Sequence, residues 1–248
     1  VLVILSAIFI SPPSLLDKAD LVGYGICHQI PERSLTVAGR QLPLCARCTG
    51  TFLGATLGLV AMLVLRRHRA SKMAAIPVLL ALVVFVALWG FDGLNSYLTL
   101  FPGAPHLYEP QNWLRLTTGM LNGLALAIFI LPIFNYTLWR EPTSERVIRG
   151  LGELAVILLV AALLVAAVLA ELPVLLYPLA IVSSLGVLAM LVLINGMLAA
   201  VVLGREGAAS SWREAAIPLV VGAALSLLEL GGMVLLRGYL TARLGLPF

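Results

Sequence analysis

Long runs of apolar residues, separated by short polar connections, dominate this chain. Seven such runs can be marked, at residues 1–11, 46–65, 74–100, 112–138, 150–170, 174–203 and 215–236. A helix rises 1.5 Å per residue and a bilayer core is about 30 Å thick, so about 20 residues are needed to cross it. Backbone groups in lipid must hydrogen-bond within the chain. The pattern therefore predicts an all-α, polytopic transmembrane helical bundle of about seven spans.

The first run is shorter than the others. Residues 1–11 cover only about half of the hydrocarbon core before Pro12 and Pro13 end the run. The chain begins at Val1 without an initiator methionine, so we expect a first span that is truncated at its start. A cleaved signal peptide is the weaker interpretation, because no basic leading segment or cleavage site is visible.

Composition places the chain among integral membrane proteins. It is 61% hydrophobic and 11% charged, with a mean hydropathy of +1.05, whereas soluble domains carry about 25% charged residues. The net charge of +4 does not indicate nucleic-acid binding, because the basic residues lie in short connections between apolar runs. We therefore expect one transmembrane domain over residues 1–248, with the lipid bilayer as its surroundings.

The distribution of Lys and Arg predicts the orientation. Three connections are basic, and they carry Arg66, Arg67, Arg69 and Lys72, then Arg140, Arg146 and Arg149, then Arg205 and Arg213. The connections at 101–111 and 171–173 have neither Lys nor Arg. Basic connections stay in the cytoplasm. This indicates a multi-pass protein of the cell membrane with a cytoplasmic N-terminus. Residues 12–45 then form an extracytoplasmic loop, although this loop contains Lys18, Arg33 and Arg40.

All three cysteines lie between residues 27 and 48. Cys45 and Cys48 form a C-x-x-C pair, and Cys27 with His28 could complete a Cys₃His tetrahedron around zinc, or around iron. Side chains of adjacent residues diverge, so His28 has a second interpretation as a group that orients a ligand or acts as an acid or base. Two other interpretations of the cysteines stay open. They can cycle through a disulfide, or pack as small apolar residues at helix ends.

Polar residues recur at one depth of the predicted spans. Asp92, Asn95 and Ser96 share a helical face, and Arg115, Thr118, Gly119 and Asn122 form a stripe on the next span. A carboxylate inside a span is costly unless it has a partner. We therefore expect Asp92 to pair with Arg47 or Arg115, with Asn95 or Asn122 satisfying its remaining lone pairs. Interfacial snorkelling or a lone interhelical hydrogen bond is the alternative for each residue.

Other polar positions in the spans are placed more loosely. Glu229 falls at a level similar to that of Asp92, and Glu153 and Asn195 fall near the opposite side, where we expect them to serve packing. Arg33, Arg47 and Arg115, together with Asn112, make a surface suited to binding an anion.

Glycines at four-residue spacing mark two of the spans. Gly50, Gly54 and Gly58 form one such face, and Gly119 and Gly123 form another. Small residues at this spacing let helix backbones approach closely. We therefore expect the spans at 46–65 and 112–138 to touch, which would bring Arg115 and Asn122 under the cysteines.

Four motifs together resemble a known family. They are Cys27-His28-Gln29-x-Pro31-x-Arg33-Ser34, then Pro43-x-Cys45-Ala46-Arg47-Cys48-Thr49-Gly50, then Phe91-Asp92-Gly93, and then Arg115-x-x-Thr118-Gly119 with Gly123. In this order they resemble an uncharacterised family of prokaryotic integral membrane proteins, domain of unknown function 2085. The resemblance covers roughly residues 20–125. It implies a multi-span membrane fold and one common site, and it implies no activity.

The residues favour a metal-binding membrane protein. Its site would contain Cys27, His28, Cys45 and Cys48 above Asp92 and Arg115, at the outer face of a bacterial inner membrane. It would meet an anionic or lipid-soluble ligand, bound by Arg33, Arg47, Asn95, Asn112, Arg115 and Asn122. Catalysis would involve Asp92 and His28, with the metal as Lewis acid. The alternatives are an oxidoreductase that passes electrons from Cys45 and Cys48 to a membrane quinone, or a non-catalytic subunit of a larger membrane complex. A transporter is disfavoured, because no polar trail continues inward from Asp92.

Overall fold

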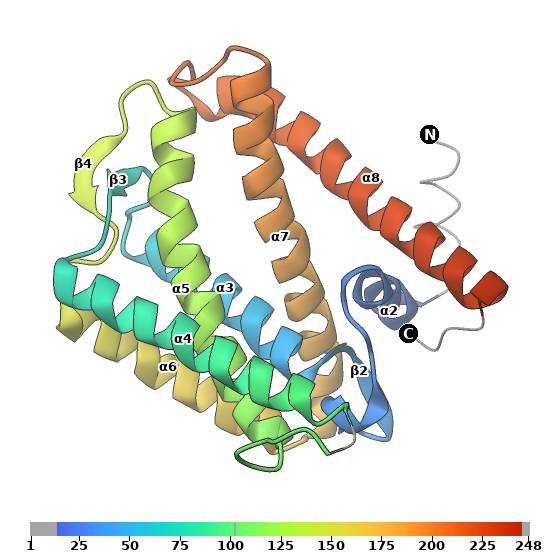
Figure 1. The fold of residues 1–248 in the computed structure, drawn as a ribbon. Helices are drawn as coiled ribbons and strands as arrows, with labels where there is room; N and C mark the ends of the chain where they lie inside the picture. The colour runs from blue at the N-terminus through green and yellow to red at the C-terminus, as the bar shows by residue number, and fades with distance from the viewer. Residues whose placement is uncertain (1–13, 102, 245–248) are drawn as a thin grey trace.

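The computed structural model describes residues 14–101 and 103–244, and helices make up most of it (Figure 1). The helices are α2 (Leu15–Ile26), α3 (Ala46–Val64), α4 (Ile76–Leu98), α5 (Asn112–Leu138), α6 (Leu151–Leu169), α7 (Leu176–Val202) and α8 (Trp212–Leu244). Six of them, α3 to α8, are long and apolar enough to cross a membrane. The predicted all-α polytopic bundle is confirmed for these spans. The predicted first span, at residues 1–11, lies outside the described residues.

Short strands and turns join the helices. An antiparallel hairpin pairs β1 (Ser34–Val37) with β2 (Arg40–Cys45), and a parallel pair joins β3 (Ala70–Lys72) to β4 (Thr143–Arg146). Two 3₁₀ turns, η1 (Pro31–Arg33) and η2 (Pro173–Leu175), precede β1 and α7. The hairpin turns at Ala38 and Gly39, which both have positive φ. A two-residue turn of this kind matches the twist of the paired strands.

The segment predicted as a loop at 12–45 is largely ordered into α2 and the hairpin. Ser14 caps α2 by accepting a hydrogen bond from the Asp17 amide. Arg40 on β2 reaches back to α2, where its Nη2 lies 2.8 Å from the Asp17 carboxylate and 2.6 Å from that of Asp20. The charge of Arg40 therefore fastens the hairpin to the helix.

The interface between α3 and α5 is the most extensive helix contact in the bundle. It is a backbone contact, because a Cβ added at Gly123 would overlap the Thr51 carbonyl oxygen, and one at Gly119 would overlap the Arg47 carbonyl oxygen. Gly50 and Gly54 on α3 meet the α5 backbone in the same way. The predicted contact between these two spans is therefore confirmed.

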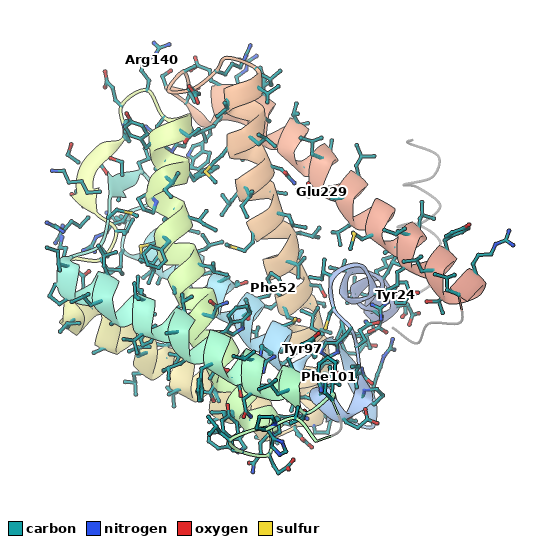
Figure 2. The ribbon with its side chains drawn as sticks, in the orientation of Figure 1. Tyr24, Phe52, Tyr97, Phe101, Arg140 and Glu229 are labelled. Carbon is teal, nitrogen blue, oxygen red and sulfur yellow. The ribbon has the colours of Figure 1, made fainter. Side chains whose placement is uncertain are left out.

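The remaining helices are arranged around this pair (Figure 1). α4 packs along α5, and α6 touches both α3 and α5. α7 lies against α3 on one side and α8 on the other, while α2 lies against α7 and the C-terminal half of α8. Figure 2 shows Phe52 of α3 beside α7, where the Phe52 carbonyl oxygen approaches Gly186.

The two ends of the bundle differ in charge. We call the end at which α3 and α5 begin the cysteine end, and the end at which they finish the basic end. The three basic connections meet at the basic end, where β3 pairs with β4 and Trp139 packs edge-on against Trp212. Arg67 donates to both carboxylate oxygens of Glu153, at 2.5 and 2.6 Å. Glu153, which was expected to serve packing, therefore forms an ion pair there.

A first prediction concerns the glycine contact. Gly123→Ala should force α3 away from α5 and lower the free energy of unfolding by about 1–3 kcal/mol or more, as overpacking does. Gly90→Ala is the matched control, because nothing lies within 4 Å of a Cβ at that helical position. It should stabilise the protein by about 0.5–1 kcal/mol. Denaturant titration in detergent measures both. Equal effects of the two substitutions would contradict the close backbone contact.

A second prediction concerns orientation. The clustering of basic connections at one end leads us to expect that end in the cytoplasm. Single cysteines introduced at the exposed positions Glu206, at the basic end, and Pro105, at the cysteine end, should react with a membrane-impermeant maleimide from opposite sides. The unsubstituted protein gives the background from its own thiols. Labelling of both positions from the same side would rule out this topology.

Candidate metal centre

The three cysteines come together where α2 ends and α3 begins. Cys27 is the residue that follows α2, Cys45 ends β2 and precedes α3, and Cys48 lies in the first turn of α3. Their sulfur atoms all lie within 4.8 Å of one another. Cys27 and Cys45 are buried and Cys48 is half-buried, and all three are free thiols. The β1–β2 hairpin therefore brings the chain back to the end of α2, so that Cys27 and Cys45, 18 positions apart, lie in one cluster.

The surroundings of the cluster favour thiolate. The backbone N–H of Cys45 donates to Cys27 Sγ at 3.2 Å, and the N-terminus of α3 points its free N–H groups at the same place. Hydrogen bonds from the side chains of Cys45 and Cys48 lower the pKa of the Cys27 thiol well below its usual range. The same contact with Cys27 raises the pKa of Cys45 to about 11. Negative charge in the cluster therefore settles first on Cys27.

The cluster is the right size for one metal ion. Tetrahedral zinc binds thiolate sulfur at about 2.3 Å, which places two such sulfurs about 3.8 Å apart. Sulfurs within 4.8 Å need only small side-chain adjustments to reach that spacing. Among the described residues, no histidine or carboxylate joins the three cysteines as a fourth ligand. The donor set is therefore three sulfurs with one coordination position left open.

His28 lies outside this sulfur group. Its Nδ1 accepts a hydrogen bond from the Ile30 amide at 3.0 Å, and Gln29 has a positive φ that turns the backbone away from α2. Loss of solvation around the ring lowers the pKa of His28; the negative charge of Cys27 opposes this effect, and the positive charges of Arg33 and Arg115 add to it. His28 therefore does not join the three cysteines as a fourth metal ligand, because its side chain and that of the adjacent Cys27 point in different directions.

Asp92 forms the expected ion pair with Arg47. Asp92 is only 1% exposed, and Arg47 Nη2 donates to both its Oδ2 and its carbonyl oxygen. The remaining carboxylate oxygen, Oδ1, accepts from the Tyr108 hydroxyl at 2.8 Å. Burial, reinforced by the Asp92 carboxylate, raises the pKa of Tyr108 to about 12, so the phenol keeps the proton that it donates. Tyr108, rather than Asn95 or Asn122, satisfies the second oxygen.

Arg115 and Arg33 both contact Ser96, near the end of α4. Arg115 donates to Ser96 Oγ at 2.9 Å and to Asn112 Oδ1 at 2.8 Å, and Arg33 donates to the Ser96 carbonyl oxygen at 3.3 Å. Asn112 donates to the carbonyl oxygens of Glu32 and Ser34. Among the described residues, no carboxylate pairs with Arg33 or Arg115. The predicted anion surface is therefore positively charged, with the Arg115 guanidinium held by Ser96 and Asn112 and the Arg33 guanidinium making one hydrogen bond.

The other expected site residues divide into three roles. Asn95 fixes the connection after α4, because it accepts from the Leu107 amide and donates to the Tyr108 carbonyl oxygen. Asn122 is 4% exposed and has no hydrogen-bond partner among the described residues. Glu229 accepts from Asn195 at 2.8 Å, on the face of α8 that meets α7 (Figure 2), so it belongs to that helix contact and not to the site.

Arg237 on α8 is a site residue that the sequence analysis missed. Its Nη1 donates to the carbonyl oxygens of Tyr24 and Cys27, and its Nη2 donates to that of His28. Its guanidinium also stacks 4.2 Å from the ring centre of Tyr24, which Figure 2 shows beside α8. A cation satisfies the free carbonyl groups at the C-terminus of a helix. The only sequence signal was a basic residue late in the last span.

A cavity of about 400 Å³ lies beside the cluster, between α3, α4, α5 and α7 and the last residue of α2, Ile26. Cys48 and Arg47 are part of its wall, together with Trp89, Asn122 and apolar side chains of α7. Cys48 is thus the member of the cluster that a molecule in the cavity would meet.

Comparison with known proteins places the chain in a family. The model of a family described as "Predicted membrane protein (DUF2085)" matches residues 27–129, which contain the cysteine cluster, Asp92 and Arg115. An uncharacterized protein of Methanothermobacter thermautotrophicus is 38% identical over 106 residues, which cover 42% of this chain and 82% of the relative. An uncharacterized protein of Methanocaldococcus jannaschii is 29% identical over 116 residues, which cover 47% of this chain and 68% of the relative.

Both relatives are archaeal, so they give no support to the expected bacterial inner membrane. No solved structure matches the chain. The matched segment begins at Cys27 and includes all four motifs that carried the resemblance. The chain therefore belongs to the DUF2085 family of predicted membrane proteins.

Proposed function

We propose that Cys27, Cys45 and Cys48 bind one divalent metal ion, zinc or iron, at the extracytoplasmic face of the membrane. The observation that carries this proposal is the approach of three sulfurs to within 4.8 Å at the N-terminus of α3. Thiolates are soft ligands that select zinc and iron over the harder magnesium and calcium. Protein sites with three ligands and an open position are typical of metals that meet a ligand or substrate.

The charges around the cluster support thiolate ligands. Three thiolates and one divalent ion leave a net negative charge, which is costly to bury without compensation. Arg33 and Arg115 lie without a carboxylate partner among the described residues, and they supply positive charge on this side of the cluster. A bound metal would act as a Lewis acid at its open position. Of the three ligands, Cys48 lines the cavity, so that position is reached from the cavity side.

A second function is supported by the free state of the thiols. Cys45 and Cys48 are free thiols in one cluster with Cys27, close enough for thiol–disulfide exchange. In this alternative, Cys45 and Cys48 lose two electrons and two protons and form a disulfide. A membrane quinone takes up both electrons and both protons and becomes the quinol.

Metal content separates these two functions. We expect the purified protein to contain about one zinc or iron per chain, and Cys48→Ser to lose most of it. His28→Ala is the matched control, because His28 lies outside the sulfur group, and it should keep the metal. Elemental analysis together with thiol titration measures this. A metal-free protein with a disulfide would favour the quinone-linked oxidoreductase. Equal metal loss in the two variants would show that His28 is also a metal ligand.

The position of Arg47 beside the cluster depends on Asp92. Asp92→Ala leaves Arg47 charged, half-buried and without its partner, whereas Asp92→Ala combined with Arg47→Leu removes both charges. Because breaking a buried pair typically costs about 3–5 kcal/mol, the single variant should be less stable than the double variant. Denaturant titration in detergent measures the difference. If the two variants unfold alike, the ion pair does not hold this end of the bundle together.

A further inference from the structure

The cavity beside Cys48 is polar at one end and apolar at the other. Along α3 its wall changes from Arg47 to Ala55, and along α5 it changes from Asn122 to Ile130. Each change takes eight residues, or about 12 Å along a helix. The polar end lies next to the cysteine cluster and the apolar end lies deeper in the bundle. The wall therefore suits an amphiphile, with its head at the cluster and its tail deeper in the membrane.

Three residues of the cavity wall carry polar groups without a protein partner. Among the described residues, Arg47 Nε and Trp89 Nε1 are buried donors without an acceptor, and Asn122 makes no hydrogen bond. A buried donor that stays unpaired costs free energy comparable to a lost hydrogen bond. Two such donors, on α3 and α4, together with an amide on α5 that makes no hydrogen bond, belong to residues of one cavity wall, which indicates that a ligand supplies the missing acceptor.

The charge at this end identifies the class of head group. Arg47 is already neutralised by its ion pair with Asp92. The other arginines of the cysteine end are not part of the cavity wall; they are Arg33, Arg40, Arg115 and Arg237. An anionic head would thus meet no unpaired positive charge in the cavity. A neutral acceptor, such as a carbonyl oxygen, fits these donors best.

We propose that this cavity binds a neutral, membrane-soluble molecule with a carbonyl head, the chemistry of an isoprenoid quinone. The carbonyl oxygens accept from Arg47 Nε, Trp89 Nε1 and the Asn122 amide, and the tail extends toward Ile130 and Ile194. A volume of about 400 Å³ falls in the usual range for ligand cavities. This inference deepens the quinone-linked alternative proposed above, and it is independent of the proposed metal site because its hydrogen bonds come from residues that are not metal ligands.

Titration calorimetry of the purified protein with decylubiquinone tests the proposal. We expect saturable binding at about one molecule per chain, which Trp89→Phe and Asn122→Leu each weaken about three- to tenfold by removing one hydrogen bond. Decylbenzene has the same tail and no carbonyl, so it should bind at least about tenfold more weakly. Absence of saturable quinone binding, or equal binding of decylbenzene, would overturn the assignment.

Two neighbouring residues of α7 provide a matched pair of cavity-filling variants. Leu191 lines this cavity, whereas Leu193 lines a separate apolar cavity of about 300 Å³ toward the basic end. Leu191→Trp should reduce quinone affinity more than about tenfold by occupying the space, and Leu193→Trp should leave it within about twofold. The reverse order would place the ligand in the other cavity and overturn the proposal.

Metal removal separates this inference from the proposed metal function. After treatment with a chelator, decylubiquinone affinity should stay within about threefold, since the three donors remain. If the protein binds quinone but never contains metal, the proposed metal site is wrong and the quinone site stands. If the protein contains metal but does not bind quinone, the proposed quinone site is wrong and the metal site stands.

Discussion

The backbone contact between α3 and α5 is the constraint on which the rest of the structure depends. Lipid gives helices no hydrophobic reason to associate, so spans associate through close packing and hydrogen bonds. At Gly119 the α5 backbone lies against the carbonyl oxygen of Arg47, one residue before Cys48. The same contact that joins the two helices therefore sets the position of the cysteine cluster relative to α5.

Arg47 links this contact to the chemistry of the site. Its backbone lies in the α3–α5 interface, its Nη2 pairs with Asp92, its Nε is buried without a partner, and its side chain is part of the cavity wall. A carboxylate in a span requires such a partner, and Tyr108 from the next connection completes its hydrogen bonds. One network thus joins α3 to α4 through the Arg47–Asp92 pair and holds the connection between α4 and α5 through Tyr108.

Much of this arrangement follows from the sequence alone. Six apolar runs of sufficient length could only be helices, because a bilayer leaves the backbone no other way to satisfy its hydrogen bonds. The spacing of Gly50, Gly54, Gly119 and Gly123 identified the pair of helices in closest contact. The grouping of all cysteines within 22 residues marked the site, and the cost of a buried charge predicted an arginine partner for Asp92.

The tertiary structure decided which groups face one another. The hairpin that folds Cys27 onto Cys45, the exclusion of His28 and the pairing of Tyr108 with Asp92 depend on backbone directions outside the helices, for which periodicity carries no information. Arg237 reaches Cys27 across 210 positions of sequence, and the cavity takes its wall from five helices. Burial cost and helical spacing act locally and can be predicted from residue types, whereas partners distant in sequence are set by the packing of the whole bundle.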